Sequence, residues 1–91
     1  MIRTSWKRYR PVKVDTGGES KLVQGEDFVR VYGSLLMKEN APTTMDVLAC
    51  EDVLPQDVLV SEEIADEYEV TNVQRIPSGL IKTLSLQRIE R

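Results

Sequence analysis

The chain has no histidine and a single cysteine, Cys50. Without histidine it lacks the commonest metal ligand and the commonest general base. One cysteine cannot form an intramolecular disulfide, which is typical of proteins made in a reducing cytoplasm. Because Cys50 lies in an apolar, strand-like run, we expect it to be a buried small hydrophobic residue and not a nucleophile.

Long apolar segments are also missing. No run approaches the length of a transmembrane helix, so we expect no membrane contact. The first ten residues, MIRTSWKRYR, lack the apolar block of a secretory signal, and we expect the protein to stay in the cytoplasm of the cell that makes it.

The 91 residues are 41% apolar, which is enough for a globular core and too much for a disordered chain. The length predicts one domain over residues 1–91. So small a domain leaves much of its surface outside the core, which makes contact with a partner chain plausible.

The stretch from residue 44 to residue 75 predicts the fold. Its β-branched and aromatic residues lie between turn formers, and no apolar stripe recurs at helical spacing. Two hairpins in this stretch predict an all-β protein, a small antiparallel β-barrel or sandwich. The expected strands are residues 45–48, 58–60 and 67–70, and the turns between them are residues 54–57 and 61–66.

The flanking segments complete the sheet. Asp15 to Gly18 is a hairpin turn signal, because glycine tolerates positive φ, and a bulge is expected near Thr71 and Asn72. On the last strand we expect Leu80, Leu84 and Leu86 to face one way. Further strands are expected at residues 5–15, 28–32, 35–37 and 80–89, with residues 20–24 a short strand or loop and turns at 24–27 and 77–79.

A long loop is expected at residues 38–43, where Asn, Pro and Thr cluster between apolar runs. The alternative there is one short helix over residues 32–40, because Leu, Met, Lys and Glu favour helices. Pro42 would end that helix.

Charge is distributed unevenly, although the net charge is only −3. Every charged residue from Glu39 to Glu69 is acidic, and the first segment is basic. This pattern is consistent either with two solvated faces or with head-to-tail contact between copies. The basic residues of the first segment are Arg3, Lys7, Arg8, Arg10 and Lys13.

No catalytic constellation emerges from the carboxylates. Glu67 and Glu69 flank Tyr68 as same-face neighbours on a half-exposed strand. Glu62, Glu63 and Asp66 lack a loop of fixed ligand spacing for a metal. We therefore expect no enzyme activity, no cofactor and no metal.

The basic and aromatic residues at the start of the chain offer a different function. Trp6 and Tyr9 could stack on bases while the neighbouring cations contact phosphates, as in small OB- or SH3-like barrels that bind single-stranded nucleic acid. A sequence pI of about 4.9 argues against a dedicated nucleic-acid binder.

The order of several short phrases resembles the head-tail joining proteins of tailed bacteriophages, also called head completion, head closure, stopper or adaptor proteins. The phrases are the D-x-G-G turn at residues 15–18, the V-x-G-like segment at 31–34, E-D-V-L-P-Q-D-V-L-V at 51–60 and the Y-E-V-x-x-V strand at 68–73. The family usually has a glycine after the proline turn, where this chain has Gln56, and another in the following hairpin, where residues 61–65 stand.

This resemblance implies a small β-barrel in the virion neck, assembled in the host cytoplasm as a ring of about six or about twelve copies. The ring would extend the DNA channel below the portal or adaptor, hold packaged double-stranded DNA and dock a tail terminator or tail tube protein. A tail terminator ring protein is the related alternative.

Two sets of residues follow as candidate sites. One set is a loop that would reach into the lumen. Acidic residues between Glu39 and Glu69 would line the channel and let the DNA slide without adhering, because phosphate affinity comes from cations. The lumen loop comprises Met37, Lys38, Glu39, Asn40, Ala41, Pro42, Thr43 and Thr44. The second set, a basic edge between subunits, comprises Lys7, Arg8, Arg10 and Lys13.

Overall fold

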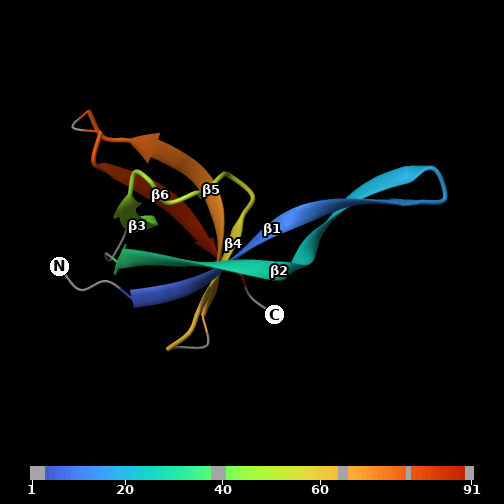
Figure 1. The fold of residues 1–91 in the computed structure, drawn as a ribbon, viewed down its shortest axis with the longest axis horizontal. Coiled ribbons are helices and arrows are strands. Elements are labelled where there is room, and N and C mark those ends of the chain that lie inside the picture. Colours follow the sequence, from blue (N-terminus) through green and yellow to red (C-terminus); the bar gives the residue numbers. More distant parts are fainter. Residues whose placement is uncertain (1–3, 38–40, 64–65, 78, 90–91) are drawn as a thin grey trace.

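The computed structural model describes residues 4–37, 41–63, 66–77 and 79–89 and has six antiparallel strands that close into a barrel (Figure 1). The order around the barrel is β1-β2-β3-β6-β5-β4. The small all-β barrel expected from the sequence is confirmed. The strands are β1 Thr4–Thr16, β2 Glu19–Leu36, β3 Thr43–Leu48, β4 Val58–Ser61, β5 Glu67–Arg75 and β6 Ile81–Arg88.

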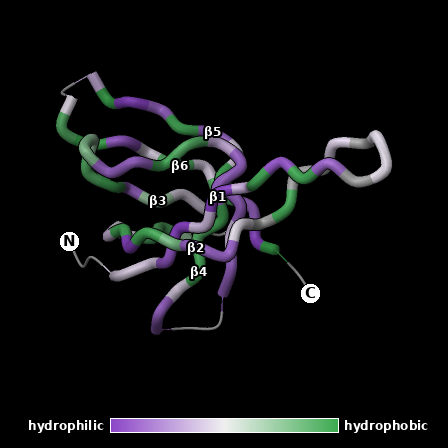
Figure 2. Tube along the Cα trace, turned by 45° about the vertical axis from the view of Figure 1, so that its right-hand side comes forward, coloured by the Kyte–Doolittle hydropathy of each residue, from purple (hydrophilic) through white to green (hydrophobic). Residues whose placement is uncertain are grey.

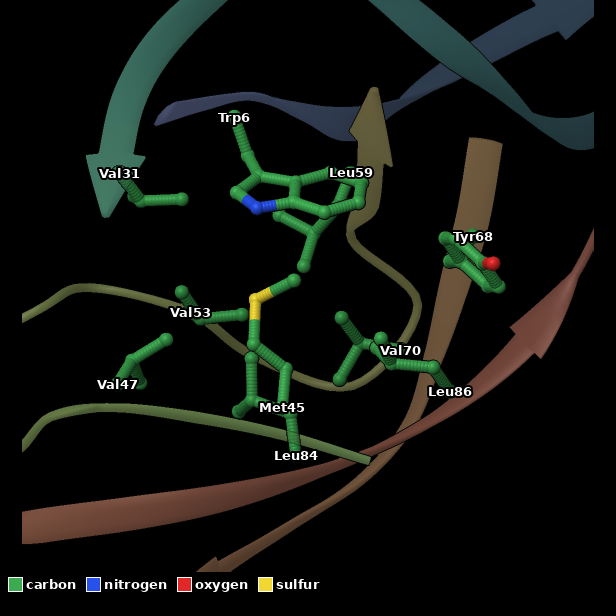
Figure 3. Packing of buried hydrophobic residues seen from close by; sticks show 10 residues of the cluster. All are labelled: Trp6, Val31, Met45, Val47, Val53, Leu59, Tyr68, Val70, Leu84 and Leu86. Atoms are coloured by element: carbon green, nitrogen blue, oxygen red, sulfur yellow. The ribbon is translucent and has the colours of Figure 1, made fainter. Parts of the chain in front are cut away.

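Alternation along the strands builds the core, because every second side chain points inward. In β3, for example, Met45 and Val47 are buried while their neighbours are half-buried. Figure 3 shows the Met45 thioether pointing toward the Trp6 indole, with Val53 contributed by the segment before β4. The buried apolar residues are Trp6, Val31, Met45, Val47, Val53, Leu59, Tyr68, Val70, Leu84 and Leu86.

Gly33 allows β2 to pass closely over β3. A Cβ built on this residue would lie 2.7 Å from the Met45 sulfur and 2.8 Å from Val47 Cγ1. Any larger side chain at this position would overlap Met45 and Val47 in the core. Glycine therefore lets β2 continue in close contact with β3, and it does not weaken the strand.

The turns largely follow the sequence. Gly17 and Gly18 both have positive φ in the turn between β1 and β2, and the register of β5 and β6 shifts between Val70 and Asn72, where the bulge was expected. The expected turn at residues 24–27 is wrong, because β2 runs through it without a break. The register with β1 is irregular there, because Tyr9 faces Phe28 and Pro11 faces Gln24, so residues 25–27 of β2 all lie opposite Arg10.

The alternative prediction of a short helix over residues 32–40 is also wrong for residues 32–37, the part that the structure describes. Residues 33–36 form the end of β2 and pair with β3, from Gly33 opposite Val47 to Leu36 opposite Thr44. Local helix propensity is overridden because this pairing closes the barrel. Residues 38–40 of that helix lie outside the described residues.

Two residues, Cys50 and Leu80, are more exposed than the sequence predicted. Cys50 is exposed, because β3 ends at Leu48 and Cys50 lies in the turn that follows. Leu80 is 71% exposed, because it lies just before β6 and not on its inner face. The inward position that follows it is taken by Lys82, whose ammonium donates to the Glu51 carbonyl at 2.6 Å.

Gln56 adopts a φ of 78° in the turn before β4, a conformation that costs a side-chain-bearing residue about 1–2 kcal/mol. Glycine removes this cost and adds about 0.5–1 kcal/mol of chain entropy to the unfolded state. We therefore expect Gln56→Gly to raise the free energy of unfolding by about 0.5–1 kcal/mol in urea denaturation. Gln56→Ala, which keeps the strain, is the control and should leave stability nearly unchanged, and a destabilised glycine variant would contradict the prediction.

Candidate assembly surface

Strands β1 and β2 extend beyond the barrel as a two-stranded arm (Figure 1). Beyond Tyr9, β1 pairs only with β2, from Pro11 opposite Gln24 to Thr16 opposite Glu19. The arm gives the molecule a length of 47 Å against 28 and 25 Å in the other dimensions. A hairpin that packs on nothing is marginally stable in water, so this arm is a natural place for a partner.

One face of the arm is lined by valines. Val12 and Val23 are directly opposite each other in the register, and Val14 follows Val12 on the same face. Apolar and polar residues alternate along the arm in Figure 2. We call Val12, Val14, Val23 and Val29 the valine face; they are 51%, 37%, 44% and 51% exposed.

The surface is hollowed where the arm leaves the barrel, in a cavity of about 220 Å³ that we call the root hollow. Gly25 lies above Arg10 at the register shift, and a Cβ there would come within 2.8 Å of the Arg10 carbonyl oxygen. The lack of a side chain at this position therefore lets β2 approach β1 closely at the wall of the hollow. Its lining residues are Arg8, Arg10, Val12, Gly25, Glu26, Asp27, Phe28 and Val29.

Beneath the root hollow, Arg10 binds the buried carboxylate of Asp57. Arg10 Nε donates to Asp57 Oδ1 and Nη2 donates to Oδ2, both at 3.1 Å. Asp57 Oδ2 also accepts from the Leu54 N–H at 2.9 Å. The hydrogen bonds that Arg10 donates to Asp57 and then to Asp52 raise the pKa of its guanidinium, so the cation is firmly charged.

Arg8 and Asp52 complete this ion cluster. Arg8 Nη1 donates to the Asp52 carbonyl oxygen at 3.0 Å and lies 3.5 Å from Asp52 Oδ2. The hydrogen bond from Arg10 lowers the pKa of Asp52. Arg8 Nε is buried and has no hydrogen-bond partner among the described residues. The cluster ties the segment before β4 to β1, and its charges cancel.

The four residues of the expected basic edge therefore do not lie together on one surface. The structure brings Arg8 and Arg10 together against two aspartates of the same chain. Lys7 lies over the Phe28 ring, 4.8 Å from its centroid, on the outer face of the sheet. Lys13 is exposed on the arm.

The candidate lumen loop is shorter than expected. Thr43 and Thr44 belong to β3 and pair with Leu86 and Ser85. Ala41 and Pro42 are exposed, as is Met37 at the end of β2, while Lys38, Glu39 and Asn40 lie outside the described residues. The longest excursion from the barrel is the arm between β1 and β2.

Several of the acidic residues also have partners in the same chain. Glu62 accepts from Arg30 at 2.6 Å, and this hydrogen bond lowers the pKa of Glu62. Asp66 pairs with Arg88 at 3.0 Å. Glu63 and Glu69 are exposed carboxylates that remain available to face a channel.

The valine face and the root hollow were not expected from the sequence. Alternation of Val12, Lys13 and Val14 before a glycine turn is a visible signal of a strand with one apolar face. The sequence carries no signal that this part of the strand leaves the barrel. The ion cluster depends on contacts between residues more than forty positions apart, which spacing does not indicate.

Among the described residues, no group of three acidic or cysteine side chains gathers as a metal site. No helical segment long and apolar enough to cross a bilayer was found in the part of the chain that the structure describes. Comparison with protein-family models, with curated proteins and with solved structures found no match.

Proposed function

We propose that the chain is a structural protein of tailed bacteriophages that forms a ring in the head-to-tail connector. The ring extends the DNA channel below the portal, retains packaged DNA and provides the surface on which the tail docks. The proposal rests on the resemblance of the turn and strand phrases at residues 15–18, 31–34, 51–60 and 68–73.

The observation that carries the proposal is the arm with its exposed valine face. An apolar sheet face on a small barrel is suited to contact with another protein copy. A contact between two different surfaces of one chain closes into a ring when the rotation between copies allows it. The small barrel itself agrees with the fold that the resemblance implies.

In this arrangement the portal or an adaptor ring lies above and a tail terminator or tail tube protein lies below. Met37, Ala41 and Pro42, which are exposed between β2 and β3, face the lumen, where double-stranded DNA passes. Exposed carboxylates such as Glu63 and Glu69 repel phosphates, so the duplex slides without adhering.

Deletion of the gene from a phage or prophage that carries it tests this function. We expect filled or partly emptied heads and separate tails of normal length, seen by negative-stain electron microscopy, with loss of infectious particles. Adding the purified protein to that lysate should restore infectivity. Tails of irregular length would favour a tail terminator instead, and unaltered infectivity would refute the proposal.

A second candidate function has one observation in its favour. The outer face of β1 and β2 carries Tyr9 against Phe28, with ring centroids 5.7 Å apart, and Tyr32 is 50% exposed on the same strand. Aromatic rings beside Lys7 could stack on the bases of single-stranded nucleic acid. Trp6, expected in that role, lies in the core at 1% exposure and is not available.

The nucleic-acid candidate is tested by titrating a fluorescent single-stranded oligonucleotide at two salt concentrations. Binding through this face should weaken with salt and weaken further in Phe28→Ala. Leu36→Ala, a change to an exposed apolar residue at the end of β2, is the control. No binding at low salt would exclude this function.

A further inference from the structure

The turn between β5 and β6 is an exposed apolar projection at the far side of the barrel from the arm (Figure 1). Leu80 is 71% exposed, the largest fraction among the exposed large hydrophobic residues described, and Ile76 is 36% exposed. Arg75, at the end of β5, is exposed and has no ion pair or side-chain hydrogen bond among the described residues. A single cation therefore flanks two aliphatic side chains.

The root hollow has the complementary chemistry. Its aliphatic walls are formed by Val12 and Val29. Its two arginines are neutralised from below by Asp52 and Asp57. Glu26 and Asp27, both exposed, have no ion pair within the described part of the chain, so the edge of the hollow is negative.

Size agrees with chemistry. The volume of about 220 Å³ is several times the ~30 Å³ that one water occupies, so a branched aliphatic side chain can enter. An apolar projection with one cation matches an apolar hollow with two carboxylates at its edge. The two arginines of the lining are already paired within the ion cluster, and Arg8 Nε alone among their side-chain nitrogens is buried without a partner among the described residues.

We propose that the root hollow of one copy receives the β5–β6 turn of a second copy, with Leu80 and Ile76 against the valines and Arg75 against Glu26 and Asp27. The two surfaces lie at different places on the chain, and the turn points away from the arm, so they meet only between copies (Figure 1). The contact is heterologous, and its repetition gives a ring or an open filament. This inference rests on the proposed function and names the surfaces that would build the ring.

Cross-linking between two single-cysteine proteins tests the contact. In a Cys50→Ser background, one protein carries Leu80→Cys and the other carries Val29→Cys, and the concentrated mixture is treated with a short bis-maleimide. We expect a heterodimer joined through positions 80 and 29, identified by peptide mass spectrometry. Either protein alone should give about tenfold less dimer. The absence of the 80-to-29 cross-link overturns the inference.

Charge reversal separates a specific contact from random collision. Arg75→Glu should lower the cross-link yield about tenfold, because it places three like charges together. Combining Arg75→Glu on one protein with Glu26→Arg and Asp27→Arg on the other should restore the yield. Lys13→Glu, which reverses another exposed arm cation, should leave the yield unchanged. Equal yields in all variants would overturn the inference.

The outcome is distinguishable from that of the proposed function. A chain that restores infectivity to the deletion lysate but gives no 80-to-29 cross-link retains the connector function and loses this contact. A chain that cross-links as expected but does not restore infectivity retains the contact and loses the connector function.

Discussion

Replacing Tyr68 with alanine is expected to lower the free energy of unfolding by about 3–5 kcal/mol, the usual loss for a large aromatic core residue. Tyr68 is 1% exposed, and its ring packs edge-on against Trp6 with centroids 6.0 Å apart. On β5 it lies between Leu59 of β4 and Arg88 of β6, so the cavity would open beside both strand pairings. Urea denaturation followed by Trp6 fluorescence measures the change.

Replacing the same residue with phenylalanine is the matched control. The Tyr68 hydroxyl is buried and has no hydrogen-bond partner among the described residues. Its removal therefore costs no hydrogen bond and relieves a desolvation penalty, so we expect Tyr68→Phe to be neutral or to stabilise by about 1 kcal/mol. A loss of stability in this variant would show that the hydroxyl has a partner. An unchanged midpoint in Tyr68→Ala would contradict the place of Tyr68 in the core.

The stability of the unmodified protein and that of Tyr68→Phe should also differ in their response to alkaline pH. Burial first, and then the nearby Asp66 carboxylate, raise the pKa of Tyr68. In the unfolded chain the phenol titrates near its ordinary value of about 10. The folded state therefore holds this proton more tightly, and the corresponding stability is lost as pH rises through the folded pKa. We expect the unmodified protein to lose stability relative to Tyr68→Phe above about pH 10.

The strands could be predicted from the sequence because each one carries its own signal. Met45 and Val47 alternate with half-buried residues on β3, and Tyr68 and Val70 alternate with half-buried or exposed residues on β5. The bulge could be predicted because Val73 is out of phase with the alternation of Tyr68 and Val70, which the sequence alone shows. These features depend on neighbouring residues and on the two-residue repeat of a strand.

Other features depend on distant parts of the chain. The sequence around Gly25 indicates a turn, but pairing with β1 on both sides keeps β2 continuous, and residues 25–27 form an irregular stretch opposite Arg10. Lys82 has an inward position that is filled by leucines elsewhere on β6, because its ammonium reaches the Glu51 carbonyl. A lysine is expected from the sequence to be exposed, and Lys82 is buried only through this one long-range hydrogen bond.

The uneven charge distribution has a similar explanation. Basic residues at the start of the chain and acidic residues in its middle were consistent with contact between copies. In the fold, β4 lies beside β1, and this places Asp57, just before β4, near Arg10. Part of the complementarity is therefore satisfied within one chain. Exposed charges without an ion pair among the described residues include Arg75 at one end of the molecule and Glu26 and Asp27 at the root of the arm.

Replacing Asp57 with alanine is expected to lower the free energy of unfolding by about 3 kcal/mol, at the low end of the range for breaking a buried ion pair. The substitution removes the buried carboxylate 3.9 Å from Arg8 Nη1, whose side chain is 9% exposed, and leaves the Leu54 N–H without its side-chain acceptor. The loss is at the low end because the Arg10 side chain is 36% exposed and can turn toward water. The change in the urea midpoint gives the measurement.

Two matched variants separate the causes of this loss. Asp52→Ala removes a carboxylate that binds the same two arginines but is 69% exposed, so it should cost much less than Asp57→Ala. Asp57→Asn retains an acceptor for the Leu54 N–H and removes the charge, so its effect should lie between the two. Equal losses in Asp52→Ala and Asp57→Ala would show that burial does not govern the cluster. A stable Asp57→Ala protein would show that the segment before β4 is held by Val53 in the core and by Lys82, without the ions.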